Sequence, residues 1–401
     1  MSGPTPLAGL KVVEFTHMVM GPAVGHILAG LGAEVTRVEP IGGDPTRRLL
    51  GSGAGYFAMY NRHKASICLD LKSEQGMEVA TRLCIGADIL IENFRPGALD
   101  RLGLGYDVLR AANPRLIYAS EKGFLSGPYE NRTALDEVAQ MMGGLAYMTG
   151  PPGRPLRAGS SVIDVTGGMF GVIAILAALE ERHRTGQGQK VVSSLFETTV
   201  YLVGQHMAQL AVTGKAADPM PARISAWAIY DVFETADEPV FIGVVSDPLW
   251  EKFCALFNLD ALWADEVLRK NNNRVLARDR IIPEVRALMK GFTRAEITAR
   301  LDGSGLPFAP IGRPEDMFDD PHLAASNGLE SVTLDTGAVT RLPGIPVEMS
   351  GQRPNMDVRL PKPGEDSEAV LRGLGYDAEA IATMMASGAV ASDSLEATSV
   401  R

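Results

Sequence analysis

The stretch Leu10-Lys-Val-Val-Glu-Phe-Thr16, together with Glu34-Val-Thr-Arg-Val38 further on, decides the fold of the first part of the chain. Both runs are apolar and rich in β-branched residues, which is typical of buried parallel strands. Between them, Gly21-Pro22 suits the first turn of a helix that is expected to run to about Leu31, where Gly32 ends it. The sequence therefore predicts a compact strand–helix–strand unit, as in nucleotide-binding sheets.

Similar strand patterns recur along the first half of the chain, at Ser66–Asp70, Asp88–Glu92, Arg115–Ala119 and Lys190–Ser193. We expect one large α/β domain with a Rossmann-like sheet, and a ligand at the carboxyl ends of its strands. No GxGxxG fingerprint follows the first strand, so a dinucleotide is not indicated. Basic side chains recur near these strand ends and predict a pocket for a polyphosphate. They are Arg62, Lys64, Lys72, Arg95 and Arg101.

The composition changes after the linker at Lys215–Arg223. A predicted β-hairpin, Trp227–Phe233 with Val240–Val245, is followed by amphipathic helical segments, which indicates a small α+β domain. Strand and helix patterns resume towards the end, and the last dozen residues look frayed. The predicted division is a large domain over 1–224, a small domain over 225–325 and a C-terminal segment over 326–401 that returns to the large domain.

A single acidic residue, Asp164, lies where Ser160-Ser-Val-Ile-Asp164 meets an apolar helix. One interpretation is a helix N-cap, in which the carboxylate accepts backbone N–H bonds. The other is a nucleophile that attacks an activated acyl group. Gly167 and Gly168 would let a substrate approach the backbone closely. The residues alone leave both interpretations open.

Composition excludes several classes of protein. The net charge of −10 among 401 residues argues against a nucleic-acid surface, which needs a basic face. Three cysteines without a CxxC motif imply neither a disulfide framework nor a metal site, and they fit the cytoplasm. The N-terminus has no secretory signal pattern, and the most apolar run, Val172–Leu179, is too short to span a bilayer. The cysteines are Cys68, Cys84 and Cys254.

Several segments together carry a resemblance to a known family: Leu7–Phe15, Leu31–Pro40, Glu92–Gly103, Asn113–Tyr118 and Arg184–Gln189. The sequence resembles the class III CoA-transferases, also called the CaiB/BaiF or formyl-CoA transferase family, over nearly its whole length. The resemblance implies a large Rossmann-like domain with a smaller α+β domain, and an interlocked homodimer. It also implies acyl-CoA and a small carboxylic acid as substrates, with no tightly bound cofactor.

The resemblance also assigns the site. It implies that Asp164 is the catalytic nucleophile, which forms a mixed anhydride with the acyl group and then an aspartyl-CoA thioester. It places coenzyme A at the ends of the predicted strands. It also places a second acidic residue, Asp136, near the nucleophile. The implied coenzyme A contacts are Val19, Met20, Leu69, Lys72, Asn93, Phe94, Arg95, Arg101, Thr133 and Asp136.

Two other functions stay open beside the transferase. A 2-methylacyl-CoA racemase has the same fold but needs a histidine in the segment Arg132–Asp136, which contains none. A CoA-binding module without activity is the third possibility. The chain departs from formyl-CoA transferase at Val19 and Pro40 and lacks its glycine-run loop, so a different acid is expected. Arg223 could hold a distal carboxylate, which would favour a small dicarboxylic acid; the alternative is a solvent-exposed arginine in the linker.

Overall fold

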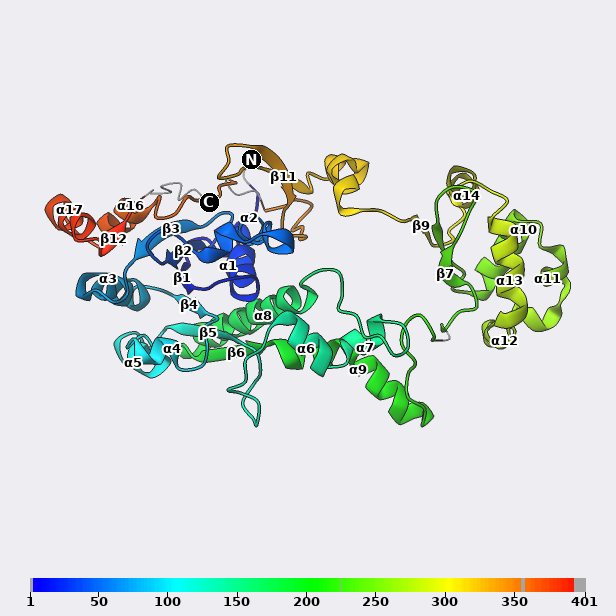
Figure 1. Cartoon of the computed structure of the whole chain (residues 1–401), viewed down its shortest axis with the longest axis horizontal. Coiled ribbons are helices and arrows are strands. Elements are labelled where there is room, and N and C mark those ends of the chain that lie inside the picture. Colours follow the sequence, from blue (N-terminus) through cyan, green and yellow to red (C-terminus); the bar gives the residue numbers. More distant parts are fainter. Residues whose placement is uncertain (1–2, 224, 355–357, 393–401) are drawn as a thin grey trace. The chain divides into compact units, whose positions relative to one another are not determined.

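The computed structural model describes residues 3–223, 225–354 and 358–392. The chain divides into two compact units, which the reader can follow in Figure 1 by the colours that mark the sequence. One unit contains the residues up to Pro219 together with those from Ala324 onward, and the other is Met220–Leu323. The predicted small domain, 225–325, differs from the second unit by a few residues at each end.

A seven-stranded sheet forms the centre of the first unit, in the order β12-β3-β2-β1-β4-β5-β6. Neighbouring strands are parallel except β12, which is antiparallel to β3. The strand order reverses between β1 and β4, where open α/β sheets bind their ligands. The predicted α/β fold with a large parallel sheet is confirmed. The strands are β1 Lys11–Phe15, β2 Glu34–Glu39, β3 Ala65–Leu69, β4 Ile89–Glu92, β5 Ile117–Lys122, β6 Lys190–Ser194 and β12 Val390–Ala391.

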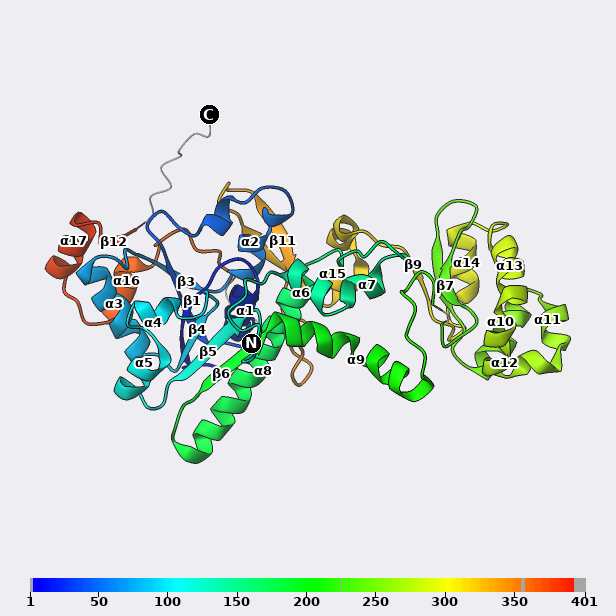
Figure 2. The ribbon, with the colours of Figure 1, turned by 60° about the horizontal axis from the view of Figure 1, so that its bottom comes forward.

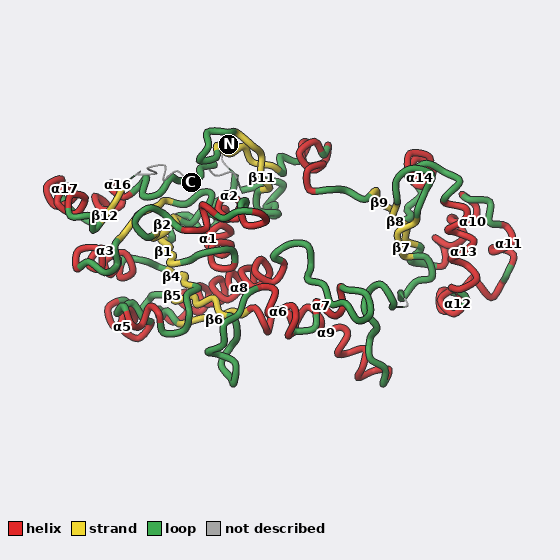
Figure 3. The backbone as a smooth tube through the Cα atoms, viewed as in Figure 1, coloured by secondary structure: helices red, strands yellow, loops and turns green. Residues whose placement is uncertain are grey.

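Helices cover both faces of this sheet. Figure 3 shows α1 and α8 on one side of the strands and α3, α5, α16 and α17 on the other. A separate hairpin, β10 Leu329–Thr333 with β11 Val339–Pro343, belongs to the same unit. The helices are α1 Met20–Gly30, α2 Tyr56–Tyr60, α3 Glu74–Ile85, α4 Ala98–Arg101, α5 Tyr106–Ala112, α6 Asp136–Met142, α7 Leu145–Thr149, α8 Val162–Thr185, α9 Leu195–Thr213, α16 Ser367–Gly373 and α17 Ala378–Ala386, with short 3-10 turns at Pro45–Arg48 and Gly51–Gly53.

Successive side chains of each strand point to opposite faces of the sheet, and both faces are covered by helices. Each strand is therefore a continuous apolar run. Val12 packs into the core under α1 and α8, whereas Val13 packs into the core on the opposite face. In β4, Ile89 and Ile91 share the first core and Leu90 belongs to the second. Burying each such side chain stabilises the fold by about 1.5–3 kcal/mol. Both faces of the sheet therefore require apolar residues.

A buried ionic cluster joins β1, β2 and the start of β3. Glu14 accepts hydrogen bonds from Arg37 Nη1 at 2.9 Å and from Lys64 Nζ at 2.8 Å, and all three side chains are fully buried. Burial lowers the pKa of Lys64 to about 8, although Glu14 opposes this shift. A Cβ atom at Gly25 would lie 1.8 Å from Glu14 Oε2, so the cluster also requires a glycine in α1.

Two of the predicted polyphosphate contacts are wrong. Lys64 is enclosed in the ionic cluster, where its ammonium group also donates to Asn61 Oδ1 at 3.1 Å. Arg62 is buried too, and it donates to Glu330 at 2.7 Å and to the Pro343 carbonyl at 2.7 Å. A cation that is already paired in the core cannot reach a phosphate, so Arg62 holds the β10–β11 hairpin instead.

Helix α8 is longer than the apolar run identified in the sequence. The run Val172–Leu179 is itself too short to span a bilayer, but the whole helix, with 24 residues, is long and apolar enough by length and composition. A core helix of a soluble protein passes the same test, however. Figure 2 shows α8 beside β5 and β6, and Val172, Ile175 and Leu179 belong to the core beneath it. Packing against the sheet accounts for the apolar residues on this side of α8, whereas Met169 and Ile173 are exposed.

The C-terminal part returns to the first unit. Val390 and Ala391 pair with Leu69 and Cys68 at the edge of the sheet, although the sequence suggested that this region is frayed. Ser367 supports the return, since its hydroxyl donates to the Ala391 carbonyl at 2.7 Å. The rest of the predicted frayed tail, residues 393–401, lies outside the described residues.

The second unit is a small α+β domain with its own core. Its three-stranded antiparallel sheet has the order β7-β8-β9, and the third strand was not predicted. Trp250, Phe253 and Ile281 are fully buried in the core beneath it. The elements are β7 Tyr230–Phe233, β8 Val240–Gly243, α10 Asp247–Leu256, α11 Asp260–Ala264, α12 Asn271–Leu276, α13 Arg278–Met289, α14 Arg294–Leu301 and β9 Phe308–Pro310, followed by α15 Pro321–Ala325 at the boundary.

Candidate active site

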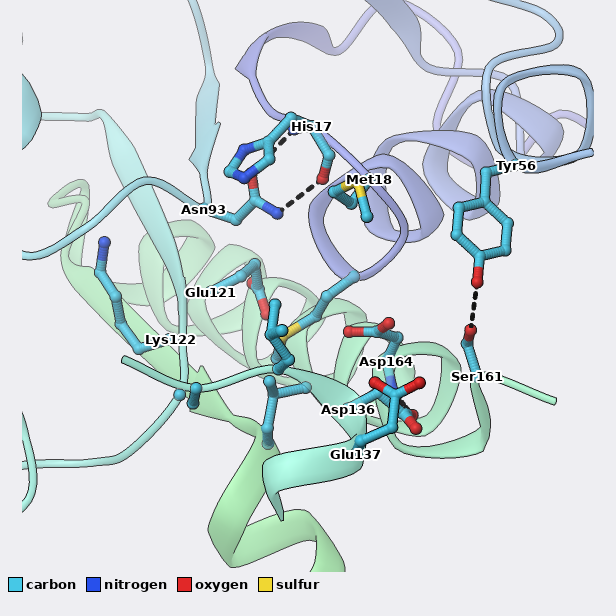
Figure 4. Close-up of a pocket in the computed structure, with 15 residues that line it drawn as sticks. His17, Met18, Tyr56, Asn93, Glu121, Lys122, Asp136, Glu137, Ser161 and Asp164 are labelled. Atoms are coloured by element: carbon cyan, nitrogen blue, oxygen red, sulfur yellow. Dashed lines mark hydrogen bonds between the residues drawn. The ribbon is translucent and has the colours of Figure 1, made fainter. Parts of the chain in front are cut away.

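The loops that follow β1 and β4 bond to each other at the point where the strand order reverses. Asn93 accepts from the His17 backbone N–H at 2.9 Å and donates to the His17 carbonyl at 2.9 Å, as Figure 4 shows. The His17 ring stacks on Phe94 with centroids 5.5 Å apart. Met18 has a φ of 62°, which is uncommon for a residue with a side chain. These contacts hold a fixed loop at the carboxyl edge of the sheet.

A cavity of about 210 Å³ lies next to this loop, within the first unit. Figure 4 shows the Asp164 carboxylate near those of Asp136 and Glu137, with Ser161 and Tyr56 to one side and Glu121 to the other. The Ser161 hydroxyl and the Tyr56 hydroxyl are 3.4 Å apart. Of the residues predicted from the sequence, the cavity brings together Met20, Asn93, Asp136 and Asp164.

Asp164 is not the cap of α8. The helix begins at Val162, with Ser161 at the N-cap position, and Asp164 lies inside the first turn. The free N–H groups are accepted instead by Asp136, whose Oδ2 is 2.8 Å from Ile163 N and 3.1 Å from Asp164 N. These two N–H groups are therefore engaged and cannot stabilise charge on a substrate. The capping interpretation is wrong for Asp164, and a residue distant in sequence supplies the cap.

The environment of Asp164 favours the protonated form of its carboxyl group. Burial raises the pKa of Asp164 to about 7, and the nearby negative charges of Asp136 and Glu137 act in the same direction. Arg157 acts against this shift. A carboxylate with a raised pKa is a stronger base than an ordinary aspartate, and it is still ionised above pH 7.

Arg157 and Glu137 belong to the site but were not predicted from the sequence. The Arg157 guanidinium lies 3.6 Å from Asp136 Oδ1 and forms an ion pair with Glu137. Gln140 connects this group to the loop before α8, because its side-chain oxygen accepts from the Ala158 N–H at 2.8 Å. Glu137 could have been suspected from its position next to Asp136, whereas nothing in the sequence brings Arg157 to the same place.

A second, larger cavity of about 1010 Å³ lies along the ends of β1, β2, β3 and β4. It shares His17 and Met18 with the first cavity, so the two adjoin. Three exposed cations line it and have no ion pair among the described residues, in contrast to Arg62 and Lys64. The predicted site residues that line it are Leu69, Lys72, Phe94, Arg95 and Arg101, the cations being Lys72, Arg95 and Arg101.

Two predicted residues line neither cavity. Val19 is 1% exposed and lies under the loop after β1. Thr133 is exposed and precedes Ala134 and Leu135, which do line the first cavity. Contact of either residue with coenzyme A stays a prediction.

Known proteins resemble this chain over most of its length. The sequence model of CoA-transferase family III matches residues 7–367. The chain belongs to CoA-transferase family III. It is 36% identical to acetyl-CoA:oxalate CoA-transferase of Acetobacter aceti, over 86% of this chain and 90% of the relative. It is 33% identical to succinate–glutarate CoA-transferase of Agrobacterium fabrum, over 92% of this chain and 96% of the relative.

A solved structure agrees with this membership of CoA-transferase family III. A CaiB/BaiF family protein from Brucella suis superposes with a TM-score of 0.81 at 34% identity, covering 92% of this chain and 100% of the other. The predicted family, enzyme class and CaiB/BaiF-type fold are thereby confirmed. The comparisons leave the individual site residues as predictions, which rest on the geometry described above.

Asp164 is expected to lower the stability of the folded chain at neutral and alkaline pH. Unfolding returns its pKa from about 7 to the ordinary value of 3.8, so between these values the folded state keeps a proton that the unfolded state has lost. Stability attributable to this group therefore falls as the pH rises through that window. Asp164→Asn should raise the free energy of unfolding at pH 8 by about 1–3 kcal/mol, allowing for partial exposure.

Urea denaturation at pH 8 and at pH 4 measures this difference. The difference in the free energy of unfolding between Asp164→Asn and the wild type should be smaller at pH 4, where the Asp164 carboxyl group is largely protonated in the folded state. A gap of the same size at both pH values would show that the pKa of Asp164 is not raised.

Proposed function

We propose that this chain transfers coenzyme A from an acyl-CoA thioester to a free carboxylic acid through a thioester formed on Asp164. The observation that supports it is the pair of adjoining cavities: one is lined by the half-buried Asp164, and the other contains three cations with no ion pair in the described part of the chain. Arginine and lysine side chains bind phosphate oxygens through charge-assisted hydrogen bonds. The nucleotide end of coenzyme A would occupy the larger cavity and its sulfur would reach Asp164.

The proposed reaction proceeds in four acyl transfers. The Asp164 carboxylate attacks the thioester carbonyl, which releases the CoA thiolate and leaves a mixed anhydride. The thiolate then attacks the Asp164 carbonyl carbon, which forms aspartyl-CoA and releases the donor acid as a carboxylate. The acceptor carboxylate attacks aspartyl-CoA, giving a second anhydride and the thiolate again. Attack of this thiolate on the acceptor acyl carbon forms the new acyl-CoA and restores Asp164.

Asp136 would support this chemistry in two ways. Its hydrogen bonds to the first turn of α8 fix the backbone at Asp164. Its negative charge makes the Asp164 carboxylate more basic, and thus a better nucleophile once ionised. Charge that develops on the thioester oxygen needs donors other than the Ile163 and Asp164 N–H groups.

The acid substrate is proposed to be a small dicarboxylic acid. The relatives named above are transferases for oxalate and for succinate and glutarate. Arg223, the candidate from the sequence for holding a distal carboxylate, belongs to the second unit. A panel of donor thioesters with oxalate, succinate, glutarate, mesaconate and itaconate, followed by mass spectrometry of the CoA products, identifies the pair.

The racemase alternative is not favoured. The named relatives are CoA-transferases, and the histidine that lines the cavity, His17, is stacked on Phe94. Burial lowers the pKa of His17. A binding module without activity is not favoured either, because it has no need of a half-buried carboxylate with a raised pKa.

We further propose a cytoplasmic homodimer. Large apolar side chains remain exposed on α8 and α9, including Ile173 at 58% and Tyr201 at 72%. The same two helices also expose Met169, Met207 and Val212. Exposed apolar patches of this kind mark interaction surfaces, and a second copy of the chain would cover them in the interlocked arrangement that the family resemblance implies.

Asp164→Asn and Asp164→Ala should each lower CoA transfer by at least about 10³-fold, because both remove the nucleophile. Both variants should fold, since Asp164 makes no capping bond. The measurement is the rate of CoA exchange between an acyl-CoA and a free acid. Acyl-CoA binding serves as the control and should be retained. An Asn variant with ordinary activity would remove Asp164 from the mechanism.

The covalent intermediate should be trapped on the wild-type enzyme by borohydride or hydroxylamine after addition of acyl-CoA alone. Peptide mass spectrometry should then find the change at Asp164. Proton exchange at the α-carbon of a 2-methylacyl-CoA in deuterated water, without a trapped Asp164, would instead support the racemase.

Lys72→Ala and Arg101→Ala should each raise the KM for acyl-CoA by about tenfold and leave kcat nearly unchanged. A phosphate contact made equally in the ground state and the transition state affects KM alone. Lys11→Ala is the matched control, because Lys11 is an exposed lysine at the opposite end of β1. Equal KM values for all three variants and the wild type would place the phosphates elsewhere.

Light scattering should give a mass of twice 42.8 kDa for the wild-type chain at micromolar concentration. Ile173→Glu combined with Tyr201→Glu should shift it towards the monomer, because charges would then enter the apolar contact. Leu276→Glu, at an exposed apolar position of the second unit, is the control and should not change the mass. A monomeric wild type would contradict the proposed dimer.

A further inference from the structure

Glu121, at the end of β5, is a buried carboxyl group that the reaction proposed above does not use. It is 3% exposed, and it lines the same cavity as Asp164 (Figure 4). Within the described part of the chain its Oε1 atom has no hydrogen-bond partner. A buried polar atom without a partner costs free energy. A polar atom left in this state beside a reaction cavity points to a partner on the substrate.

The hydrogen bonds of Ser193 show what kind of partner Glu121 Oε1 can take. The Ser193 hydroxyl contacts both Glu121 Oε2 and, at 3.0 Å, the Gly167 carbonyl oxygen. A hydroxyl has one proton, and a carbonyl oxygen can only accept. When Ser193 donates to Gly167, Glu121 Oε2 must itself carry a proton and donate to Ser193. Oε1 is then the carbonyl oxygen of a neutral acid, and it needs a donor.

The surroundings of Glu121 agree with a neutral carboxyl group. Burial raises the pKa of Glu121 to about 8, and the charge of Glu92 adds to this shift. Ser193 and Lys122 act in the opposite direction, but Lys122 is engaged by Glu92 and by the Phe94 carbonyl.

The position of Glu121 along α8 defines its distance from the reaction. A Cβ atom at Gly171 would lie 2.5 Å from Glu121 Oε1, so the carboxyl group lies directly against this glycine. Gly171 is two helical turns, about 11 Å, beyond Asp164. Between them, Met20 covers Gly167, with its terminal methyl 2.8 Å from where a Cβ atom would be. A short substrate chain could therefore span the distance from Asp164 to Glu121, and it would pass over the apolar side chain of Met20.

The two cavities adjoin at His17 and Met18, so the pantetheine arm of an acyl-CoA bound as proposed above would run from that point towards Asp164. We propose that Glu121 Oε1 accepts a hydrogen bond from the amide N–H of the pantetheine arm nearest the sulfur. This inference rests on the proposed transferase function. The amide nitrogen is one ethylene unit from the sulfur, so it remains near Glu121 while the sulfur is bonded to the Asp164 carbonyl. A hydroxyl group on the acyl chain is the other source of the same donor.

Two short thioesters test the assignment directly. One is the succinyl thioester of N-acetylcysteamine, and the other replaces its amide N–H with an ester oxygen. The wild type should prefer the amide by about tenfold or more in kcat/KM, because the ester leaves Oε1 unpaired. Glu121→Gln should keep the preference, since its amide can donate to Ser193 and its oxygen can accept. Glu121→Leu and Glu121→Met should reduce the ratio of kcat/KM for the amide to kcat/KM for the ester to near one.

The acyl arm is tested with malyl and succinyl thioesters of the same N-acetylcysteamine. A Glu121-dependent preference that follows the acyl hydroxyl, and not the amide, would overturn the assignment to pantetheine. An amide-to-ester ratio that is the same in the wild type and the Leu and Met variants would overturn it as well, as would loss of the ratio in Glu121→Gln.

Matched controls keep the two proposals separate. Glu180→Leu replaces an exposed glutamate of α8 and should leave the ratio unchanged. Thermal unfolding identifies variants that do not fold, and the Gln variant remains decisive if both apolar variants fail. Transfer by the wild type with no effect of Glu121 on the ratio refutes this inference alone. Absence of transfer from any acyl-CoA refutes the proposed function, and this inference with it.

Discussion

The Asp136 carboxylate holds the candidate site together. It accepts two backbone N–H bonds at the start of α8 and lies close to Asp164 in the same cavity. A helix start inside a protein must find acceptors for its first N–H groups. When a carboxylate from another helix supplies them, it also brings a negative charge beside the first turn. Burial is the main reason for the raised pKa of Asp164, and the charge of Asp136 adds to it. One side chain thus anchors the helix and contributes to the pKa of the residue proposed to react.

The opposite wall of the site depends on a second set of buried charges. Glu14, Arg37 and Lys64 connect the ends of three strands, and Arg37 also donates to the Thr16 carbonyl at 2.9 Å. Removing one partner from such a cluster leaves an uncompensated charge, which typically costs about 3–5 kcal/mol. The cluster supports the loop that contains His17 and Met18, where the two cavities meet. Its rigidity is therefore a condition for both binding regions.

Prediction from the sequence succeeded where local pattern determines structure. Strands such as β1 and β4 are buried on both faces, so their apolar runs are unambiguous. Prediction failed where a charge had two possible environments. Arg62 and Arg101 cannot be told apart by residue type, and only the fold shows that Arg62 is paired with Glu330 whereas Arg101 lines a cavity. Likewise, β12 is too short for any periodicity and forms because the edge of β3 is free to pair.

The sequence by itself determined the family, the α/β class and the choice of Asp164 as the residue to examine. These depend on motifs and on burial patterns that are local in the chain. Only the tertiary structure decided that Asp136 caps α8, that Arg157 lies beside it, and that Glu121 has an oxygen without a partner among the described residues near the same cavity. The reason is physical: the pKa and the hydrogen-bond partners of a buried group are set by atoms from other elements, which only folding brings within reach.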